Sequence, residues 1–162
     1  MHRCGFVSYN KKKMSRKRRL ALFLPLLMAA WHGGAQPTRA DHTAIYVADL
    51  KKSADFYRYV MLLHEIPEPF HDGKHVWFRT GEHTQLHIIQ GAAAVTAHDI
   101  NSHMAFSVPD ISAFTRHLDE LHIKYGDWSQ KIKTPQTRVD GVKQIYLQDP
   151  DNLWIEVNDD KF

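Results

Sequence analysis

The segment Asp41–Leu50 (DHTAIYVADL) recurs 61 residues later as Ser102–Ile111 (SHMAFSVPDI). Both copies place His, Ala, an apolar residue, Val and Asp at the same positions. Apolar and polar residues alternate along the first seven positions, which is typical of a half-buried strand. The Asp that follows is a typical helix N-cap. An internal repeat of this kind predicts two similar modules.

The rest of each half extends the repeat. A helix is expected after each strand, over Lys51–Leu63 and Ser112–Leu121. Three strand-like runs follow in the first half: Leu63–Ile66, His75–Arg79 and Gln85–Gln90. Three also follow in the second: a short run near Ile123–Tyr125, Lys143–Gln148 and Leu153–Asn158. The motif Asp149–Asn152 (DPDN) predicts a tight turn between the last two.

Each half therefore predicts the order β-α-β-β-β, in modules of about 40–91 and 102–159 joined by the linker Gly91–Asn101. A module of roughly 60 residues buries too little surface to be stable alone. We expect a single α+β domain over 36–162, in which the two modules pair into a cupped mixed sheet with helices on its outer face.

The first 35 residues predict a targeting signal. They hold eight basic and no acidic residues, and the apolar run Leu20–Trp31 precedes Gly33-Gly34-Ala35. This is the pattern of a secretory signal peptide, cleaved after Ala35. Twelve apolar residues are too few to span a bilayer, which takes roughly 20. We expect a secreted or periplasmic bacterial protein that is not inserted in a membrane after cleavage.

The charge of the remaining chain argues against a nucleic-acid partner. The whole sequence has 21 Lys and Arg against 18 Asp and Glu. Without the eight basic residues of 1–35, residues 36–162 keep 13 against 18. A net acidic domain is poorly suited to a phosphate backbone. The single cysteine, Cys4, lies in the predicted signal, so the mature chain has no thiol for a disulfide or for nucleophilic catalysis.

Strand alternation assigns four ionisable side chains to one face of the predicted sheet. If the apolar residues of each strand face the helices, then His42, His87, His103 and Glu156 face the other way. Unpaired polar groups on a packed face are costly. A divalent metal ion (Zn, Ni, Co, Fe or Mn) would satisfy all four.

These residues resemble the vicinal oxygen chelate superfamily, which includes glyoxalase I, epimerases, fosfomycin-resistance proteins, extradiol dioxygenases and bleomycin-binding proteins. The resemblance covers about residues 40–159. It is carried by four motifs: HTAIYV (His42–Val47), SADFY (Ser53–Tyr57), HMAF (His103–Phe106) and DPDNLWIE (Asp149–Glu156).

The resemblance implies a metal held by His42, His103 and Glu156, with His87 at the fourth position. Bacterial glyoxalase I is similar elsewhere but carries Glu at that point, so Glu156 is left as the candidate catalytic base. The resemblance also implies a homodimer, in which modules pair within one chain or are exchanged between two.

The leading functional hypothesis is a glyoxalase-like lyase or isomerase, related to lactoylglutathione lyase, that acts on a small oxygen-rich substrate. It would chelate two substrate oxygens and stabilise an enediolate or oxyanion. The alternatives are an Fe(II)-dependent dioxygenase using His42, His103 and Glu156, and a non-catalytic protein that binds a metabolite or antibiotic. The sequence places five further residues in the candidate substrate pocket: Tyr46, Arg79, Gln144, Tyr146 and Trp154.

Overall fold

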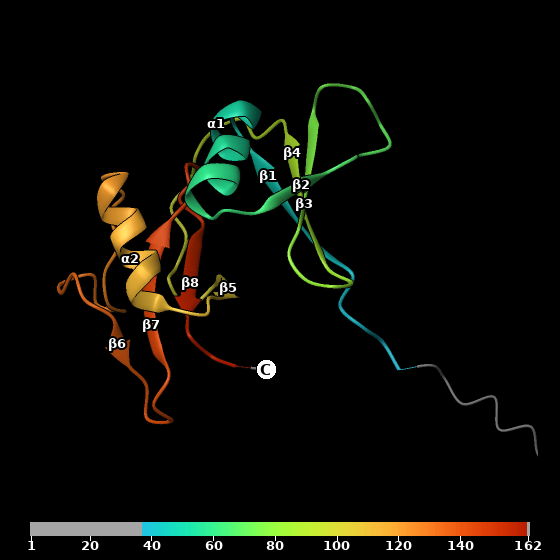
Figure 1. Cartoon of the computed structure of the whole chain (residues 1–162). Coiled ribbons are helices and arrows are strands. Elements are labelled where there is room, and N and C mark those ends of the chain that lie inside the picture. Colours follow the sequence, from blue (N-terminus) through green and yellow to red (C-terminus); the bar gives the residue numbers. More distant parts are fainter. Residues whose placement is uncertain (1–36, 162) are drawn as a thin grey trace, which may run out of the picture. The chain divides into compact units, whose positions relative to one another are not determined.

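The computed structural model describes residues 37–161, which form an α+β fold of two modules, each with its own four-stranded mixed sheet (Figure 1). The first module comprises β1 (His42–Val47), α1 (Leu50–Asp55), η1 (Phe56–Val60), β2 (His64–Ile66), β3 (His75–Arg79) and β4 (Gln85–Gln90). The second comprises β5 (His103–Ser107), α2 (Ile111–Glu120), β6 (Gln136–Thr137), β7 (Lys143–Gln148) and β8 (Trp154–Asn158).

The two sheets have the same topology. Their strand orders are β1-β4-β3-β2 and β5-β8-β7-β6, and in each the first strand is parallel to the last while the other pairs are antiparallel. The registers also match, because Ala44 lies opposite His87 and Ala105 lies opposite Glu156. The predicted two-module α+β fold is thus confirmed, and β1 and β5 are each left as a sheet edge within the chain.

The two predicted N-caps are present. The carboxylate of Asp49 accepts a hydrogen bond from the Lys52 backbone N–H, and that of Asp110 accepts from Ser112 and Ala113. Both helices begin one residue earlier than predicted. The first is not one continuous α-helix, because it widens into the π-helix η1, closed by a bond from the Met61 N–H to the Phe56 carbonyl.

One strand prediction is wrong. Ile123–Tyr125 forms no strand, and only the neighbouring Gly126 makes an isolated bridge, to Tyr146 of β7. The chain then coils around the carboxylate of Asp127, which accepts hydrogen bonds from the backbone N–H groups of Lys131 and Ile132. It returns to the same edge of β7 as β6, in a segment for which no strand was predicted.

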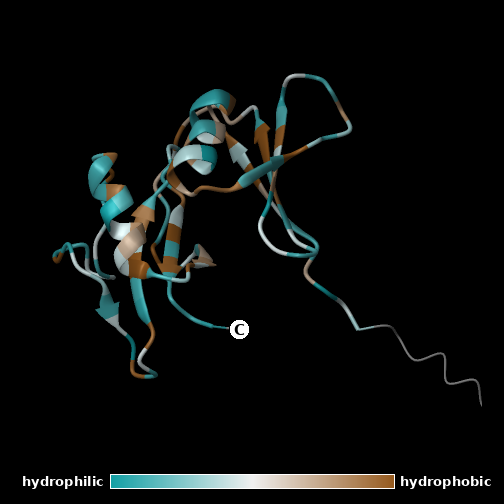
Figure 2. Cartoon of the chain, viewed as in Figure 1, coloured by the Kyte–Doolittle hydropathy of each residue, from teal (hydrophilic) through white to brown (hydrophobic). Residues whose placement is uncertain are grey.

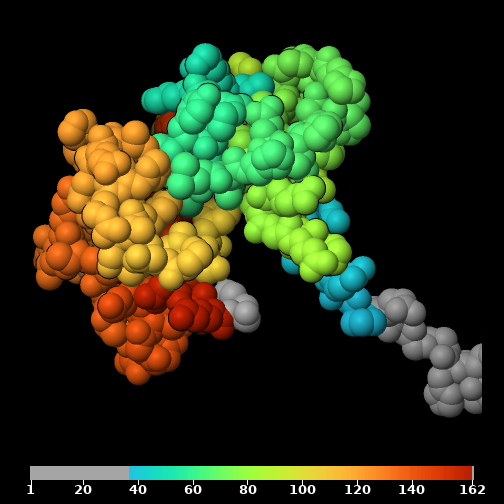
Figure 3. Space-filling model, in the orientation of Figure 1, coloured from blue at the N-terminus to red at the C-terminus, as the bar shows by residue number. Residues whose placement is uncertain are grey.

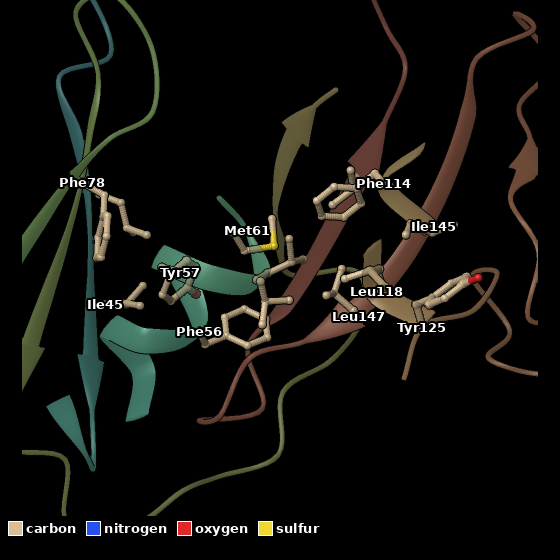
Figure 4. Close-up of a cluster of buried hydrophobic side chains, with 14 of the residues drawn as sticks. Ile45, Phe56, Tyr57, Met61, Phe78, Phe114, Leu118, Tyr125, Ile145 and Leu147 are labelled. Atoms are coloured by element: carbon tan, nitrogen blue, oxygen red, sulfur yellow. The ribbon is translucent and has the colours of Figure 1, made fainter. Parts of the chain in front are cut away.

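One hydrophobic cluster links both modules (Figure 4). Figure 4 shows side chains of η1, with Met61 after it, between those of the first sheet and those of α2 and β7. The buried residues at this junction include Phe56, Tyr57, Met61, Phe114 and Leu118. Figure 2 shows that α2 contains both hydrophilic and hydrophobic residues. The helices thus cover the apolar faces of both sheets.

The predicted DPDN turn forms and joins the modules. Asp149 accepts a hydrogen bond from the Tyr57 hydroxyl at 2.8 Å. Asp151 accepts from the Ser53 hydroxyl at 2.7 Å and from the Ala48 backbone N–H at 2.8 Å. Both carboxylates are almost fully buried. These bonds tie the β7–β8 turn of the second module to the helix of the first.

The predicted signal peptide over 1–35 lies outside the described residues. Within residues 37–161, no helix combines the length and the apolar character needed to cross a bilayer.

Candidate functional site

The open face of the first sheet carries a stack of three aromatic rings. The indole of Trp77 lies parallel to the His87 imidazole, with ring centroids 3.8 Å apart, and His87 stacks on His42 at 4.2 Å. Phe70, from the segment between β2 and β3, contacts Trp77 edge-on at 6.1 Å. The structure places Trp77 on the same face as the two histidines.

Hydrogen bonds orient both imidazoles of this stack. Nδ1 of His42 lies 2.6 Å from a carboxylate oxygen of Asp41, and Nε2 of His87 lies 2.9 Å from the Gln85 side-chain carbonyl. Burial lowers the pKa of His87, and the neighbouring His42 lowers it further. The neutral imidazole is therefore favoured, which is the form that binds metals.

The open face of the second sheet is built around the carboxylate of Glu156. The Tyr146 hydroxyl donates to its Oε2 at 2.6 Å, and the Asn158 amide donates to its Oε1 at 2.8 Å. Gln144 donates in turn to the Tyr146 hydroxyl at 3.0 Å. Burial, together with the hydrogen bond to Glu156, raises the pKa of Tyr146 well above its usual value. Tyr146 therefore stays a protonated donor.

His103 lies beside this carboxylate, with its Nε2 3.4 Å from Glu156 Oε2. Its other nitrogen, Nδ1, donates to the backbone carbonyl of Ile100 at 2.7 Å. Metal-ligating histidines commonly use one ring nitrogen for a carboxylate or carbonyl and the other for the ion. His42 and His103 both show this arrangement, so the donor set of His42, His103 and Glu156 fits a divalent metal ion.

The four predicted ligands form two pairs in one chain, His42 with His87 and His103 with Glu156. Within residues 37–161, no three side chains of metal-binding type lie close enough together to hold an ion. His42 and His103 both line a groove of about 700 Å³ that runs between β1 and β5. A four-ligand site would therefore need a different pairing of the modules, in which the His42–His87 pair meets a His103–Glu156 pair.

The remaining predicted pocket residues are divided among several places. Gln144 and Tyr146 belong to the Glu156 network, and the Gln144 side-chain oxygen is buried with no partner among the described residues. Trp154 donates its indole N–H to the His98 carbonyl, which holds it against the linker. Tyr46 is 61% exposed. Its hydroxyl lies against Gly91, where a Cβ atom would be only 2.2 Å from the hydroxyl oxygen.

Arg79 is exposed at the end of β3. It lies across from Gln85 on the open face of the first sheet. The structure thus puts Arg79 near the histidine stack and Gln144 near the carboxylate, but it gathers no single pocket from all five residues.

Three further residues touch the site. Strand alternation places Asn158 on the same face as Glu156, and Trp77, a pocket candidate whose face the sequence left ambiguous, lies directly across from His87. Arg138 comes from the segment 131–140, which the sequence predicts to be a loop over the site; it reaches Glu156 Oε1 at 3.9 Å and also pairs with Asp140 and Asp160.

Comparison with known proteins agrees with this arrangement of paired modules. Residues 39–157 match the family model described as the Glyoxalase/Bleomycin resistance protein/Dioxygenase superfamily. This chain belongs to that superfamily. The Bacillus subtilis (strain 168) protein YwbC, named as uncharacterized, is 28% identical to it over 124 residues, which cover 73% of this chain and 94% of YwbC.

Solved structures of the superfamily share the fold. The oxidase ChaP-H2 has a TM-score of 0.64 at 21% identity, covering 78% of this chain and 97% of its own. Lactoylglutathione lyase from Agrobacterium tumefaciens has a TM-score of 0.58 at 21% identity, covering 76% and 95%. At these identities the likeness concerns the fold alone, and members of one fold can carry different chemistry.

Proposed function

We propose that this superfamily member is a metal-dependent lyase or isomerase of glyoxalase type acting on a small oxygen-rich substrate. The observation that carries the proposal is the environment of Glu156. Its carboxylate is 7% exposed, yet both oxygens accept hydrogen bonds, and an imidazole nitrogen lies 3.4 Å away. Buried carboxylates held in this way are typical of ligands and of catalytic bases.

His42, His103 and Glu156 would hold the ion, with His87 as the fourth ligand. A divalent ion bound there would supply a Lewis acid for neighbouring oxygens of the substrate. Glu156 would accept a proton from the substrate carbon beside a carbonyl and return it to the adjacent carbon. Tyr146 and Asn158 would keep the carboxylate oriented during the transfer, since each donates to one of its oxygens.

We propose that the complete site forms in a homodimer. His42 and His87 of one chain would then face His103 and Glu156 of the other. Two observations support this assembly: the ligands lie in two separate pairs within one chain, and in the described residues β1 and β5 each leave their outer sheet edge unpaired. A free sheet edge favours association with another chain.

We also propose that the protein is exported after removal of residues 1–35. The support is the basic stretch followed by the apolar run Leu20–Trp31.

One observation favours a second candidate, an Fe(II)-dependent dioxygenase. Nε2 of His87 is already used by Gln85, and the ring lies between Trp77 and His42. If His87 does not bind the ion, then His42, His103 and Glu156 remain as two histidines and one carboxylate, the set typical of non-haem iron oxygenases.

The test is elemental analysis of the protein purified without chelators, together with His42→Ala and His87→Ala. His98→Ala is the control, since this exposed loop histidine lies outside both pairs. About one equivalent of Zn, Ni or Co that is lost in both variants but not in the control supports the lyase. Iron that survives His87→Ala but not His42→Ala supports the dioxygenase.

A chain that binds no metal after incubation with each ion would contradict both enzymes and leave a non-catalytic binding protein. If metal is bound, turnover of 2-oxoaldehyde adducts is then measured for the wild type and for Glu156→Gln. Loss of the carboxylate base is expected to lower the rate by about 10²–10⁴-fold.

A further inference from the structure

A hollow of about 600 Å³ lies at the end of the first sheet, beside the histidine stack. Its walls are the residues that lead into β1 and the turn that joins β3 to β4, and Figure 3 shows these two segments side by side. Two arginines, Arg39 and Arg79, line it. Its volume is within the range of small-molecule sites.

Neither guanidinium is used elsewhere in the described structure. Within residues 37–161, Arg39 and Arg79 make no ion pair, whereas Arg58 and Arg138 are each held by two or more carboxylates. The acidic side chains at the hollow do not neutralise the arginines. Asp41 is bound to His42 at 2.6 Å. Glu82 is 89% exposed and faces His83 at 3.5 Å.

The hollow is connected to the candidate site by the strand register. Arg79 lies directly across from Gln85, and Gln85 lies across from His42 on the next strand. The three residues share one face of the sheet, with two strand spacings, about 10 Å, between the backbones of Arg79 and His42. Gln85 also holds His87 through its side-chain carbonyl.

The β3–β4 turn is closed in a way that shapes the hollow. The Thr80 hydroxyl donates to the Thr84 hydroxyl at 3.0 Å. A Cβ at Gly81 would lie 2.6 Å from Thr84 Oγ1, so a larger residue would push this hydroxyl away. Gly81 thus lets Thr84 sit at the edge of the hollow next to Gln85.

We propose that this hollow is an anion subsite, in which Arg79 and Arg39 bind a remote carboxylate of the substrate while its opposite end reaches His42. The substrate class is then a small 2-oxo or 2-hydroxy compound with a second carboxylate. Guanidinium groups suit this task because their planar fork matches a carboxylate. The position of the reacting end rests on the proposed function, but binding of the anion needs no metal.

The first experiment separates the subsite from the metal. Chelator-treated protein is titrated with glutarate by calorimetry, in the wild type and in Arg79→Gln, Arg39→Gln and Arg116→Gln. Arg116 is the matched control, an exposed arginine on α2. We expect Arg79→Gln and Arg39→Gln each to weaken binding about fivefold to tenfold, and Arg116→Gln to bind as the wild type does.

The second experiment uses the metal-loaded protein and compares 2-oxoglutarate with 2-oxopentanoate, which has the same chain length but lacks the remote carboxylate. We expect 2-oxoglutarate to bind about tenfold more tightly, and Arg79→Gln to remove this advantage while 2-oxopentanoate binding is unchanged.

The subsite is overturned if metal-free wild type shows no glutarate binding at millimolar concentration, or if Arg116→Gln weakens it as much as Arg79→Gln does. A failure of the proposed function has a different signature. The first experiment would then succeed, while His42→Ala would leave 2-oxopentanoate binding by the metal-treated protein unchanged.

Discussion

In the first module the residue opposite Ala44 is His87, and in the second the residue opposite Ala105 is Glu156. The next strand continues the contrast, because Trp77 lies across from His87 whereas Tyr146 lies across from Glu156. Trp77 stacks its ring on the imidazole, and Tyr146 donates a hydrogen bond to the carboxylate. One backbone register therefore supports an aromatic, neutral half-site and a charged, hydrogen-bonded one.

The neighbouring positions follow the same division. Ile89 in the first module corresponds to Asn158 in the second, and only Asn158 can donate to a carboxylate. The neighbours of position 87 are the Trp77 ring, Gln85 and Ile89, whereas both oxygens of Glu156 accept hydrogen bonds in the described structure. A buried charge needs such donors to be stable. The second module thus holds the better-supported carboxylate, which is the base proposed above.

The turns before the last strand of each module also differ. The Asp149–Asn152 turn of the second module is buried against the helix of the first. The corresponding Thr80–Thr84 turn of the first module borders an open hollow instead. The first sheet therefore keeps one end available for a ligand, and the second uses that end to join the modules.

The largest expected effect comes from replacing each aromatic residue that contacts a proposed ligand, Tyr146 beside Glu156 and Trp77 beside His87, by Phe. Tyr146→Phe removes the hydroxyl that donates to Glu156, and metal affinity is expected to fall about 10–100-fold. Trp77→Phe keeps an aromatic ring beside His87 and is expected to change affinity less than about threefold. Competition with a chromophoric chelator measures both. Equal losses in the two variants would contradict the division into an aromatic and a hydrogen-bonded half-site.

A smaller effect is expected at the two helix caps. Asp110 accepts two backbone hydrogen bonds and Asp49 accepts one. Removing a cap typically costs about 1 kcal/mol of unfolding free energy. We expect Asp110→Ala to cost about that much and Asp49→Ala roughly half. Urea unfolding at constant m-value measures both. A greater loss of unfolding free energy in Asp49→Ala than in Asp110→Ala would contradict the ranking by number of cap hydrogen bonds.

The smallest effect concerns pH. Burial raises the pKa of Asp149, so its charge costs stability above that pKa, and this cost is relieved as pH falls toward 3.8. The hydrogen bond from Lys133 lowers the pKa of Asp119, so its contribution is present above pH 3.8 and is lost as pH falls below it. Wild type should therefore gain stability relative to Asp149→Asn on acidification, and should lose it relative to Asp119→Asn.

Urea unfolding at a series of pH values from about 7 to about 3 measures both differences. Parallel pH profiles for the two variants would contradict the assignment of opposite shifts to these carboxylates.

Much of the backbone plan could be predicted from the chain alone, because it depends on local signals. Alternating apolar residues gave the bounds of β3, β4 and β7 to the residue, and Asp49 and Asp110 located the helix starts to within one residue. The run at Ile123–Tyr125 failed because strand propensity says nothing about which edge is available for pairing. Asp127 instead gathers the chain into a loop, and β6 forms further on.

The candidate site was likewise predicted only in part from the sequence. Alternation and the repeat by themselves placed His42, His87, His103 and Glu156 on one type of face, since side-chain direction in a strand has a period of two. The tertiary structure decided that these four form two pairs, that Tyr146, Asn158 and Arg138 surround Glu156, and that Arg39 meets Arg79 at one hollow. Such contacts join residues distant in sequence, and they follow from how sheets, hairpins and turns pack.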